Sequence, residues 1–357
     1  MKKEHFLLLI ILSFSAFPAW SQPADYTGER PENIILLIGD GMGVAQIYAG
    51  LTVNGGHLNL EKFPVCGFSR TQSASDWVTD SGAGGTALAT GHKTYNHAIG
   101  VDPDTVRVPS ILELAEEHGK STGLIATSEI SHATPASFIA HVPNRKDQAA
   151  IARQFPGSGI DFFAGGGAKY IFEGENPPAQ QLTMSGYSLL TDISQLDTLT
   201  TLPAGLLAWP NKPPSVLKGR GDYLPSVTQK ALELLSGNPK GFFIMIEGSQ
   251  IDWGGHDNDI DYVTSEMIDF DQAVGKALAF AEKNGKTLVI VTADHETGGL
   301  ALPEGDFEAK TVKGKFTTGG HTGVMVPVFA FGPGAGIFGG IQENTVIFEK
   351  MKFLFGF

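Results

Sequence analysis

Continuous apolar runs divide this chain at regular intervals, and each run ends in a polar or glycine-rich segment. Four such runs are clear: 33–38, 122–127, 241–246 and 287–292. Runs of this length, rich in branched residues and without alternation, are typical of strands buried on both faces, as in a parallel sheet. Two further strands are expected at 160–167 and 326–331. We place the latter at a sheet edge, because Pro327 cannot donate a backbone hydrogen bond.

Between these runs, apolar residues recur at helical spacing. Helices are expected at 44–53, 109–117, from residue 144, at 226–235 and at 261–283. Pro109 suits the first position of its helix, and Val263, Met267 and Phe270 form a stripe on the longest helix that is more typical of core than of a cofactor pocket. Strands alternating with helices predict an α/β fold with a central, largely parallel sheet sandwiched between helices.

Length and composition leave the domain count open. With 357 residues, 42% of them hydrophobic, the chain can form one large domain or two smaller ones. We take residues 22–357 as a single domain. The segment 170–223, where periodicity weakens and prolines gather, is interpreted as a peripheral insertion. A net charge of −13 and the lack of any Lys/Arg cluster argue against a nucleic-acid partner.

Residues 1–21 are interpreted as a secretory signal peptide. Lys2 and Lys3 precede an apolar run, and small residues precede an expected cut before Gln22. The alternative is a membrane anchor, but a run of about twelve apolar residues is short against the ~20 that span a bilayer. We therefore expect a periplasmic or secreted protein with no membrane anchor after cleavage. Cys66 is the single cysteine, which excludes an internal disulfide; it is expected to be a small buried residue.

The segment around Ser81 combines a hydroxyl with a helix start. Polar turn formers at 79–81 are followed by a run of small residues with Gly82, Gly84 and Gly85, and the first good helix formers are at 87–89. A loop that ends on a helix N-terminus is therefore expected. Free backbone N–H groups and the helix dipole favour an anion there, and the Ser81 hydroxyl could attack phosphorus or a carbonyl. The glycines are interpreted as clearance for the group that Ser81 would attack. The alternative is an ordinary N-capped helix.

Carboxylate, imidazole or hydroxyl groups follow most of the predicted strands. Each group could be structural, and Asp40 alone could simply occupy a tight turn. Parallel strands present their carboxyl ends at one edge of a sheet, so repetition points to a shared site. Imidazole with carboxylate suits zinc, and carboxylate with hydroxyl oxygen suits magnesium. The candidate ligands are Asp40, Thr134, Glu247, Asp252, His256, Asp294, His295 and His321.

Several of these motifs, in this order, resemble the alkaline phosphatases. The resemblance rests on residues 80–81, 93–96, 132–136, 247–252 and 292–295, and it runs from about residue 33 to the last strand. The segment 248–256 is especially similar to compact, cold-adapted bacterial members. The resemblance implies a metal-dependent phosphomonoesterase that acts through a phosphoserine intermediate and releases inorganic phosphate.

The resemblance also implies a role for each candidate, with two Zn²⁺ and one Mg²⁺ per subunit. Ser81 would be the nucleophile, and Arg145 would clamp the phosphate, for which a planar two-pronged donor is suited. One zinc would be held by Asp252, His256 and His321, and the other by Asp40, Asp294 and His295. Magnesium would be held by Asp40, Thr134 and Glu247. A homodimer is implied as well, with 299–320 as a short crown-like segment.

Two positions depart from the best-known enterobacterial pattern. His132, beside the magnesium ligands, stands where that pattern has Asp, and imidazole there would let zinc compete. Trp253, expected to contact substrate, stands where that pattern has Lys. Without that charge we expect weaker phosphate holding and faster product release; unchanged phosphate inhibition in a Trp253→Lys variant would contradict this. The remaining histidines (57, 92, 97, 118 and 141) are expected to be structural or exposed.

Two rival functions remain open at this point. The first is another activity of the same superfamily, a phosphodiesterase or a sulfatase. Residues 82–85 do not supply the Pro and Arg that follow a sulfatase nucleophile, and Thr134, Glu247 and Arg145 supply groups that diesterases generally lack. The second is a metal-dependent binding protein without catalysis, which loss of turnover in a Ser81→Ala variant would exclude.

Overall fold

The structure is a computed structural model, and it describes residues 27–357. The predicted signal peptide lies outside the described residues. Within the described range, no helix combines the length and apolar character needed to cross a membrane.

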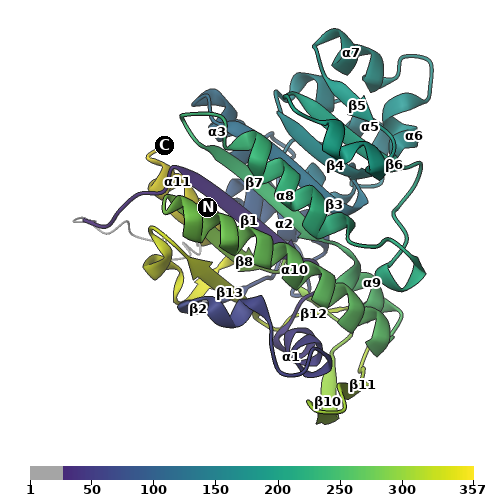
Figure 1. Cartoon of the computed structure of the whole chain (residues 1–357), viewed down its shortest axis with the longest axis vertical. Coiled ribbons are helices and arrows are strands. Elements are labelled where there is room, and N and C mark those ends of the chain that lie inside the picture. Colours follow the sequence, from purple (N-terminus) through teal and green to yellow (C-terminus); the bar gives the residue numbers. More distant parts are fainter. Residues whose placement is uncertain (1–26) are drawn as a thin grey trace, which may run out of the picture.

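A ten-stranded sheet forms the centre of the molecule (Figure 1). In spatial order its strands are β14 (Gly340–Glu343), β2 (Val65–Arg70), β13 (Val326–Phe331), β8 (Thr287–Thr292), β1 (Asn33–Gly39), β7 (Phe242–Gly248), β3 (Ser121–Glu129), β4 (Phe162–Gly166), β6 (Ala204–Trp209) and β5 (Ser188–Leu190). The seven strands from β8 to β5 are parallel. The predicted α/β class and the largely parallel sheet are therefore confirmed.

Helices cover both faces of this sheet, because the central strands are apolar on both sides. In β1, Ile35 and Leu37 pack with α8 (Tyr223–Leu235) and α10 (Ile260–Asn284). Ile34 and Leu36 point the other way, into a second core. That second core is closed by α2 (Ser81–Thr90), α3 (Ile111–Glu117) and α11 (Asn344–Phe355). All four β1 residues are fully buried, as the continuous apolar run predicts.

The strand with Pro327 does not lie at the sheet edge, so that prediction was wrong. β13 pairs antiparallel with β2 on one side and with β8 on the other. Pairing with β8 involves only Phe329 to Phe331, so the missing N–H of Pro327 interrupts no bond there. The Thr292 hydroxyl instead donates to the Pro327 carbonyl at 2.9 Å. Cys66, on β2, is exposed rather than buried, which corrects a second expectation.

The segment 170–223 is more regular than its weak periodicity indicated. It contributes β5 and β6, which extend the parallel sheet beyond β4 at one end. It also contains most of α6 (Ala168–Phe172), all of α7 (Pro178–Met184) and 3₁₀ helices at Ile193–Thr198 and Val216–Lys218, and Figure 1 shows this part in teal beside α5 (Gln148–Ala152). Short elements with few apolar repeats explain why sequence periodicity missed them.

Three predicted helix starts needed correction, one of them that of α8, which begins at Tyr223 rather than at residue 226. Helix α3 begins at Ile111, because Ser110 rather than Pro109 ends the preceding loop: its hydroxyl accepts from the Glu113 N–H in a capping box. The helix expected from residue 144 is the short α5, which begins at Gln148 and is capped by Asp147.

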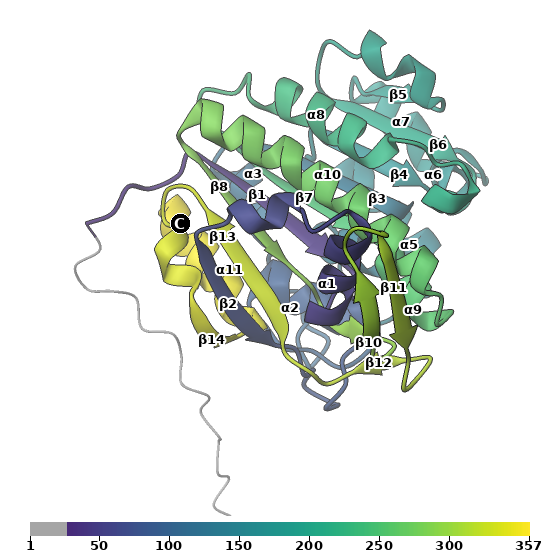
Figure 2. The same cartoon turned by 60° about the horizontal axis from the view of Figure 1, so that its bottom comes forward.

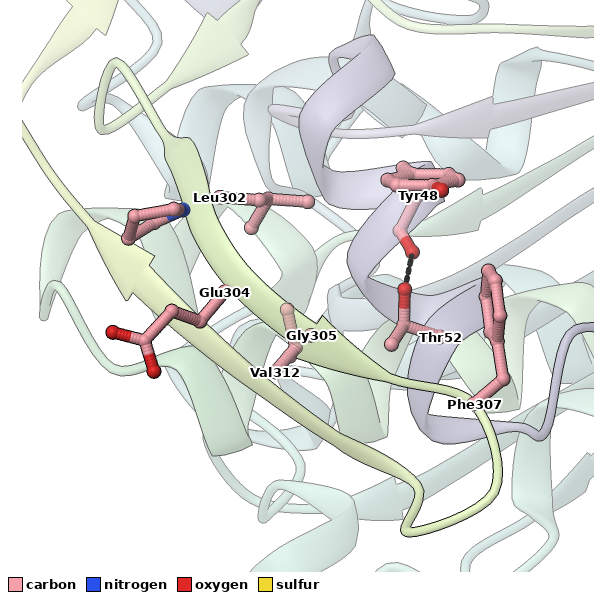
Figure 3. Close-up of a pocket in the computed structure, with 8 residues that line it drawn as sticks. Tyr48, Thr52, Leu302, Glu304, Gly305, Phe307 and Val312 are labelled. Carbon is pink, nitrogen blue, oxygen red and sulfur yellow. Dashed lines mark hydrogen bonds between the residues drawn. The ribbon is translucent and has the colours of Figure 1, made fainter.

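The segment 299–320 forms a two-stranded hairpin, β10 (Ala301–Asp306) and β11 (Thr311–Lys315), that packs against α1 (Val44–Val53), as Figure 2 shows. Tyr48 and Phe307 meet edge to face at 6.1 Å. Between hairpin and helix lies a pocket of 160 Å³ (Figure 3), which has no histidine in its lining. The hairpin therefore packs against α1, and β11 also contacts α10.

Candidate functional site

Three neighbouring central strands deliver carboxylates to one edge of the sheet. Asp40 follows β1, Glu247 lies near the end of β7, and Asp294 comes two residues after β8. Because β7, β1 and β8 are adjacent and parallel, these ends converge, as expected for a ligand site in an α/β sheet. All three carboxylates are fully buried.

Helix α9 (Gln250–His256) places two more candidates one turn apart. His256 Nε2 lies 3.4 Å from Asp252 Oδ1, consistent with side chains four residues apart on a helix. His321 Nε2 lies 3.5 Å from the same oxygen and 3.2 Å from His256 Nε2. His321 reaches this position because β12 (His321–Thr322) pairs with β9 (Glu296–Thr297), the segment that follows His295.

The candidate ligand atoms form three groups, in each of which the atoms lie within 4.8 Å of one another. The groups are Asp252, His256 and His321; Asp40, Asp252 and His295; and Asp40, His132 and Glu247. Asp294 is also adjacent to the second group, since its Oδ2 lies 3.3 Å from His295 Nε2. Shared Asp40 and Asp252 join the three groups into one continuous centre.

Several buried oxygen atoms at this centre lack a hydrogen-bond partner, which is consistent with cation binding. Both carboxylate oxygens of Asp40, Oε1 of Glu247, Oδ2 of Asp294 and Oγ1 of Thr134 are buried without a hydrogen-bond partner within the described part of the chain. Unpaired buried carboxylates are costly unless a cation compensates them. The donors are oxygens and imidazole nitrogens, a set that suits Zn²⁺ and Mg²⁺. The residues present therefore fit bound metal.

Burial and mutual repulsion raise the pKa values of these carboxyl groups. Desolvation, followed by the charge of Asp294, raises the pKa of Asp40 well above its usual range. Desolvation likewise raises the pKa of Asp294 to about 8 and that of Glu247 to about 7. Asp252 differs: burial opposes its ionisation, but the hydrogen bond with His256 and the charges of the neighbouring histidines together outweigh burial and lower its pKa. A cluster of acids with raised pKa values marks a functional site.

The imidazoles respond in opposite ways to their surroundings. The hydrogen bond with Asp252 raises the pKa of His256 to about 9. Burial lowers the pKa of His295 well below its usual range, and burial followed by the Arg145 charge lowers that of His132 to about 3. His295 and His132 are therefore neutral, which is the form that can bind a metal.

Ser81 is the first residue of α2 and lies against this centre. Asp80 is the N-cap, and its side chain accepts from the Ala83 N–H at 3.0 Å. The predicted cap is thus present, but Asp80 rather than Ser81 provides it. The Ser81 hydroxyl is free for another role, and its Oγ lies 3.3 Å from His295 Nε2. A nucleophile at a buried helix N-terminus beside metal ligands is suited to attack an anionic substrate.

Arg145 lies on the same side as Ser81, held by two neighbours. Its Nη1 donates to Asp80 Oδ2 at 2.8 Å, and its Nη2 lies 3.2 Å from His132 Nε2. Burial would raise the pKa of Asp80, but Arg145 and the His97 N–H outweigh burial and lower it to about 2. Asp80 therefore stays ionised and fixes the guanidinium next to Ser81.

The glycines of α2 pack against protein, contrary to their interpretation as clearance for the group that Ser81 would attack. A side chain on Gly84 would meet Cβ and the carbonyl of Asp294 at 3.1 and 3.2 Å. One on Gly85 would meet Ser137 at 3.0 Å, and one on Gly82 would meet the Ala98 carbonyl at 3.0 Å. These glycines let α2 approach the segments that carry metal ligands.

Sequence reasoning missed several residues that support the site. Asp80 is interpreted in the sequence only as part of a turn. An Asp immediately before a helix is nevertheless a recognisable N-cap signal. His97 is exposed, as expected, but its Nδ1 also lies 3.2 Å from Asp80 Oδ2, a contact that was not expected. The Thr297 hydroxyl donates to Asp252, and neither of these two contacts has a sequence signal. Trp253 meets the ring of His132 edge to face at 6.2 Å.

Fold and site together define an α/β protein with a largely parallel sheet and a carboxylate–imidazole centre that can hold metal beside a serine. Residues 31–312 match the family model described as alkaline phosphatase. The chain is 35% identical to alkaline phosphatase 4 of Bacillus subtilis, covering 90% of this chain and 88% of the relative, and 33% identical to alkaline phosphatase of Escherichia coli, covering 93% and 88%. The chain belongs to the alkaline phosphatase family, whose members are phosphomonoester hydrolases.

Solved structures agree with this membership. The alkaline phosphatase from the Antarctic bacterium TAB5 superposes with a TM-score of 0.88 at 42% identity, covering 92% of this chain and 99% of that one. A cold-active alkaline phosphatase from Shewanella gives a TM-score of 0.86 at 32% identity, covering 90% and 99%. The predicted likeness to compact, cold-adapted members is confirmed.

Proposed function

We propose that the chain is a secreted, metal-dependent phosphomonoesterase in which Ser81 forms a phosphoserine. One observation carries this proposal: the Ser81 hydroxyl lies at a buried helix N-terminus, 3.3 Å from His295 Nε2. Family membership supports the phosphomonoesterase activity. Arg145, held by Asp80, provides the nearby positive charge that a phosphoryl group requires.

The reaction would consist of two displacements at phosphorus. In the first, Ser81 Oγ attacks the phosphorus, and the bond from phosphorus to the leaving oxygen breaks. In the second, water attacks the same phosphorus and the bond to Oγ breaks, which releases inorganic phosphate. The guanidinium of Arg145 and the N–H groups at the start of α2 stabilise negative charge on the phosphoryl oxygens in both steps.

The assignment of metals rests on the family resemblance. It matches the first ligand group, but it takes Asp294 in place of Asp252 in the second and Thr134 in place of His132 in the third. Asp252, His256 and His321 would hold one Zn²⁺, and Asp40, Asp294 and His295 the other. Mg²⁺ would be held by Asp40, Thr134 and Glu247. When bound, these cations lower the pKa of a nearby hydroxyl or water and neutralise developing charge.

His132 makes the third metal site ambiguous. Its ring lies within the same ligand group as Asp40 and Glu247, so imidazole would favour zinc over magnesium there. A His-to-Asp mutant of the TAB5 alkaline phosphatase has been determined with Mg bound in its M3 site. We expect His132→Asp to raise the Mg²⁺ content of the purified protein at the expense of Zn²⁺, which metal analysis of both proteins would measure.

Two further features belong to the proposal. Residues 1–21 would direct export to the periplasm or the medium. A homodimer would cover a group of exposed apolar side chains: Val44, Trp77, Val324 and Met325. Val44, Val324 and Met325 line one pocket, and Trp77 packs against Gly323 next to Val324. Light scattering gives the mass in solution; a monomeric wild type would contradict dimerisation through this surface.

The decisive experiment compares wild type with Ser81→Ala on 4-nitrophenyl phosphate and bis(4-nitrophenyl) phosphate. We expect wild type to prefer the monoester, and Ser81→Ala to lose about a thousandfold or more in kcat/KM while keeping its circular dichroism spectrum. Retained turnover in Ser81→Ala would remove Ser81 from its role. Preference for the diester would favour a phosphodiesterase instead, and no turnover in metal-loaded wild type would favour a binding protein.

A further inference from the structure

Lys212 lies at the rim of the site, in the loop that follows β6. Its ammonium lies 4.4 Å from the centroid of the Trp253 ring. Trp253 follows Asp252 in the chain, and its ring meets that of His132. A cation from the segment 170–223 is therefore close enough to influence the centre.

Hydrogen bonds fix the loop on both sides of Lys212. The Gln250 side-chain amide donates to the carbonyls of Pro213 at 3.1 Å and Pro214 at 3.4 Å. On the other side, the Asn211 carbonyl accepts from the Gly167 N–H at 2.9 Å. Gln250 is the first residue of α9, the helix that carries Asp252 and His256. The base of the Lys212 side chain is thus held in place relative to the metal ligands.

The charge of Lys212 is not committed to another residue. Its side chain is exposed, and no carboxylate oxygen of residues 27–357 lies within 4.0 Å of its ammonium. The other cations around the centre and behind this loop are paired: Arg145 with Asp80, and Arg220 with Glu266 and Asp269. A cation–π contact at an exposed site is weak, so the ammonium can turn from Trp253 toward an anion.

We propose that Lys212 is a specificity-determining residue that favours phosphate monoesters whose leaving group carries a second negative charge. This inference rests on the function proposed above. Arg145 and the start of α2 would hold the phosphoryl group that is transferred. Lys212, at the rim beside Trp253, would then meet a carboxylate or second phosphate on the leaving group, in a protein whose net charge of −13 otherwise repels such substrates.

The test compares phenyl phosphate with 4-carboxyphenyl phosphate in the metal-loaded enzyme at low salt. In Lys212→Met, we expect the ratio of kcat/KM for the carboxylated substrate to that for phenyl phosphate to fall about threefold, mainly through KM. Intrinsic reactivity of the two esters cancels in this comparison. Lys212→Arg should keep the wild-type ratio, and 1 M NaCl, with a Debye length of about 3 Å, should abolish the difference.

Lys218 provides the matched control, because it is exposed in the same segment and Lys218→Met removes the same charge. This variant should keep the wild-type ratio. An equal effect of Lys212→Met on both substrates, or the same fall in Lys218→Met, would overturn the proposal. Failure of the wild type to hydrolyse either ester would instead contradict the proposed function, so the two failures are distinguishable.

Discussion

Ser81 depends for its proposed reactivity on residues distant in the sequence. His295 is 214 positions away, yet its Nε2 lies 3.3 Å from Ser81 Oγ. Asp80 is adjacent in sequence, but its role depends on Arg145, 65 positions later. None of these residues would indicate phosphoryl transfer if it stood alone. The short distances between Ser81, His295 and the Asp80–Arg145 pair are what support the Ser81 hydroxyl as a nucleophile.

Glu116 provides a residue-scale prediction about pH, away from the metal centre. Its carboxylate accepts from the Thr122 hydroxyl, and burial, with a smaller contribution from Asp161, raises its pKa from 4.5 to about 7. A raised acid pKa means that folding favours the protonated form. The contribution of Glu116 to the free energy of unfolding is therefore complete below about pH 4.5 and is lost as the pH rises through about 7.

Replacing Glu116 by Gln removes this pH-dependent loss of stability, because the amide does not ionise. The amide oxygen can still accept the hydrogen bond from the Thr122 hydroxyl. Since Glu116 is only partly buried, solvent screening reduces the effect to about 1 kcal/mol. We expect Glu116→Gln to match wild type at pH 4 and to melt about 1–2 °C higher at pH 8 in thermal unfolding. Glu117→Gln, an exposed neighbour, is the control. A constant Tm difference across this pH range would show that Glu116 does not titrate between the two values.

At the scale of elements, helix α2 positions Ser81 through close packing. Gly84 faces the backbone of Asp294, where an added Cβ would lie 3.2 Å from the carbonyl oxygen. We expect Gly84→Ala to push α2 away from the Asp294 segment, lowering kcat/KM about tenfold or more and the free energy of unfolding by about 1–3 kcal/mol.

Gly157→Ala is the control for this change, because a Cβ there would meet nothing within 4 Å. It should leave kcat/KM unchanged. Denaturant unfolding and steady-state kinetics on 4-nitrophenyl phosphate measure both effects. If Gly84→Ala behaves like this control, tight contact between α2 and the Asp294 segment is not needed for activity.

At the scale of the whole molecule, the metal centre concentrates unpaired charge where three central strands end. Asp40, Glu247 and Asp294 are fully buried and have raised pKa values. Without cations these groups repel one another, so metal binding should also stabilise the fold. We expect chelation at pH 8 to abolish activity and to lower Tm by about 10 °C, and added Zn²⁺ and Mg²⁺ to restore both.

Asp40→Asn tests whether this stabilisation arises from the centre itself. Asp40 belongs to two of the three ligand groups, so the variant should show a smaller Tm response to Zn²⁺ than wild type in differential scanning fluorimetry. An equal response in both proteins would mean that the metal stabilises another part of the molecule.

The sequence by itself determined the strands, the edge of the sheet that carries the site, and the candidate ligands. The runs at 33–38 and 287–292 are apolar throughout because both faces of β1 and β8 are covered, and this pattern is local. Asp40, Glu247 and Asp294 could be placed together because parallel strands end at one edge. Residue spacing did not show which of these ligands would bind which metal. That assignment came from the family resemblance.

Only the tertiary structure decided what depends on contacts between distant segments. Pro327 lies inside the sheet because its missing N–H falls beyond the pairing with β8. Cys66 is exposed because it lies on the face of β2 opposite to the buried Gly67 and Ser69. The glycines of α2 are packing residues because Asp294 lies against them. Lys212 reaches the site because Gln250 holds its loop. Such contacts join segments far apart in the chain, so the local pattern of apolar and polar residues cannot predict them.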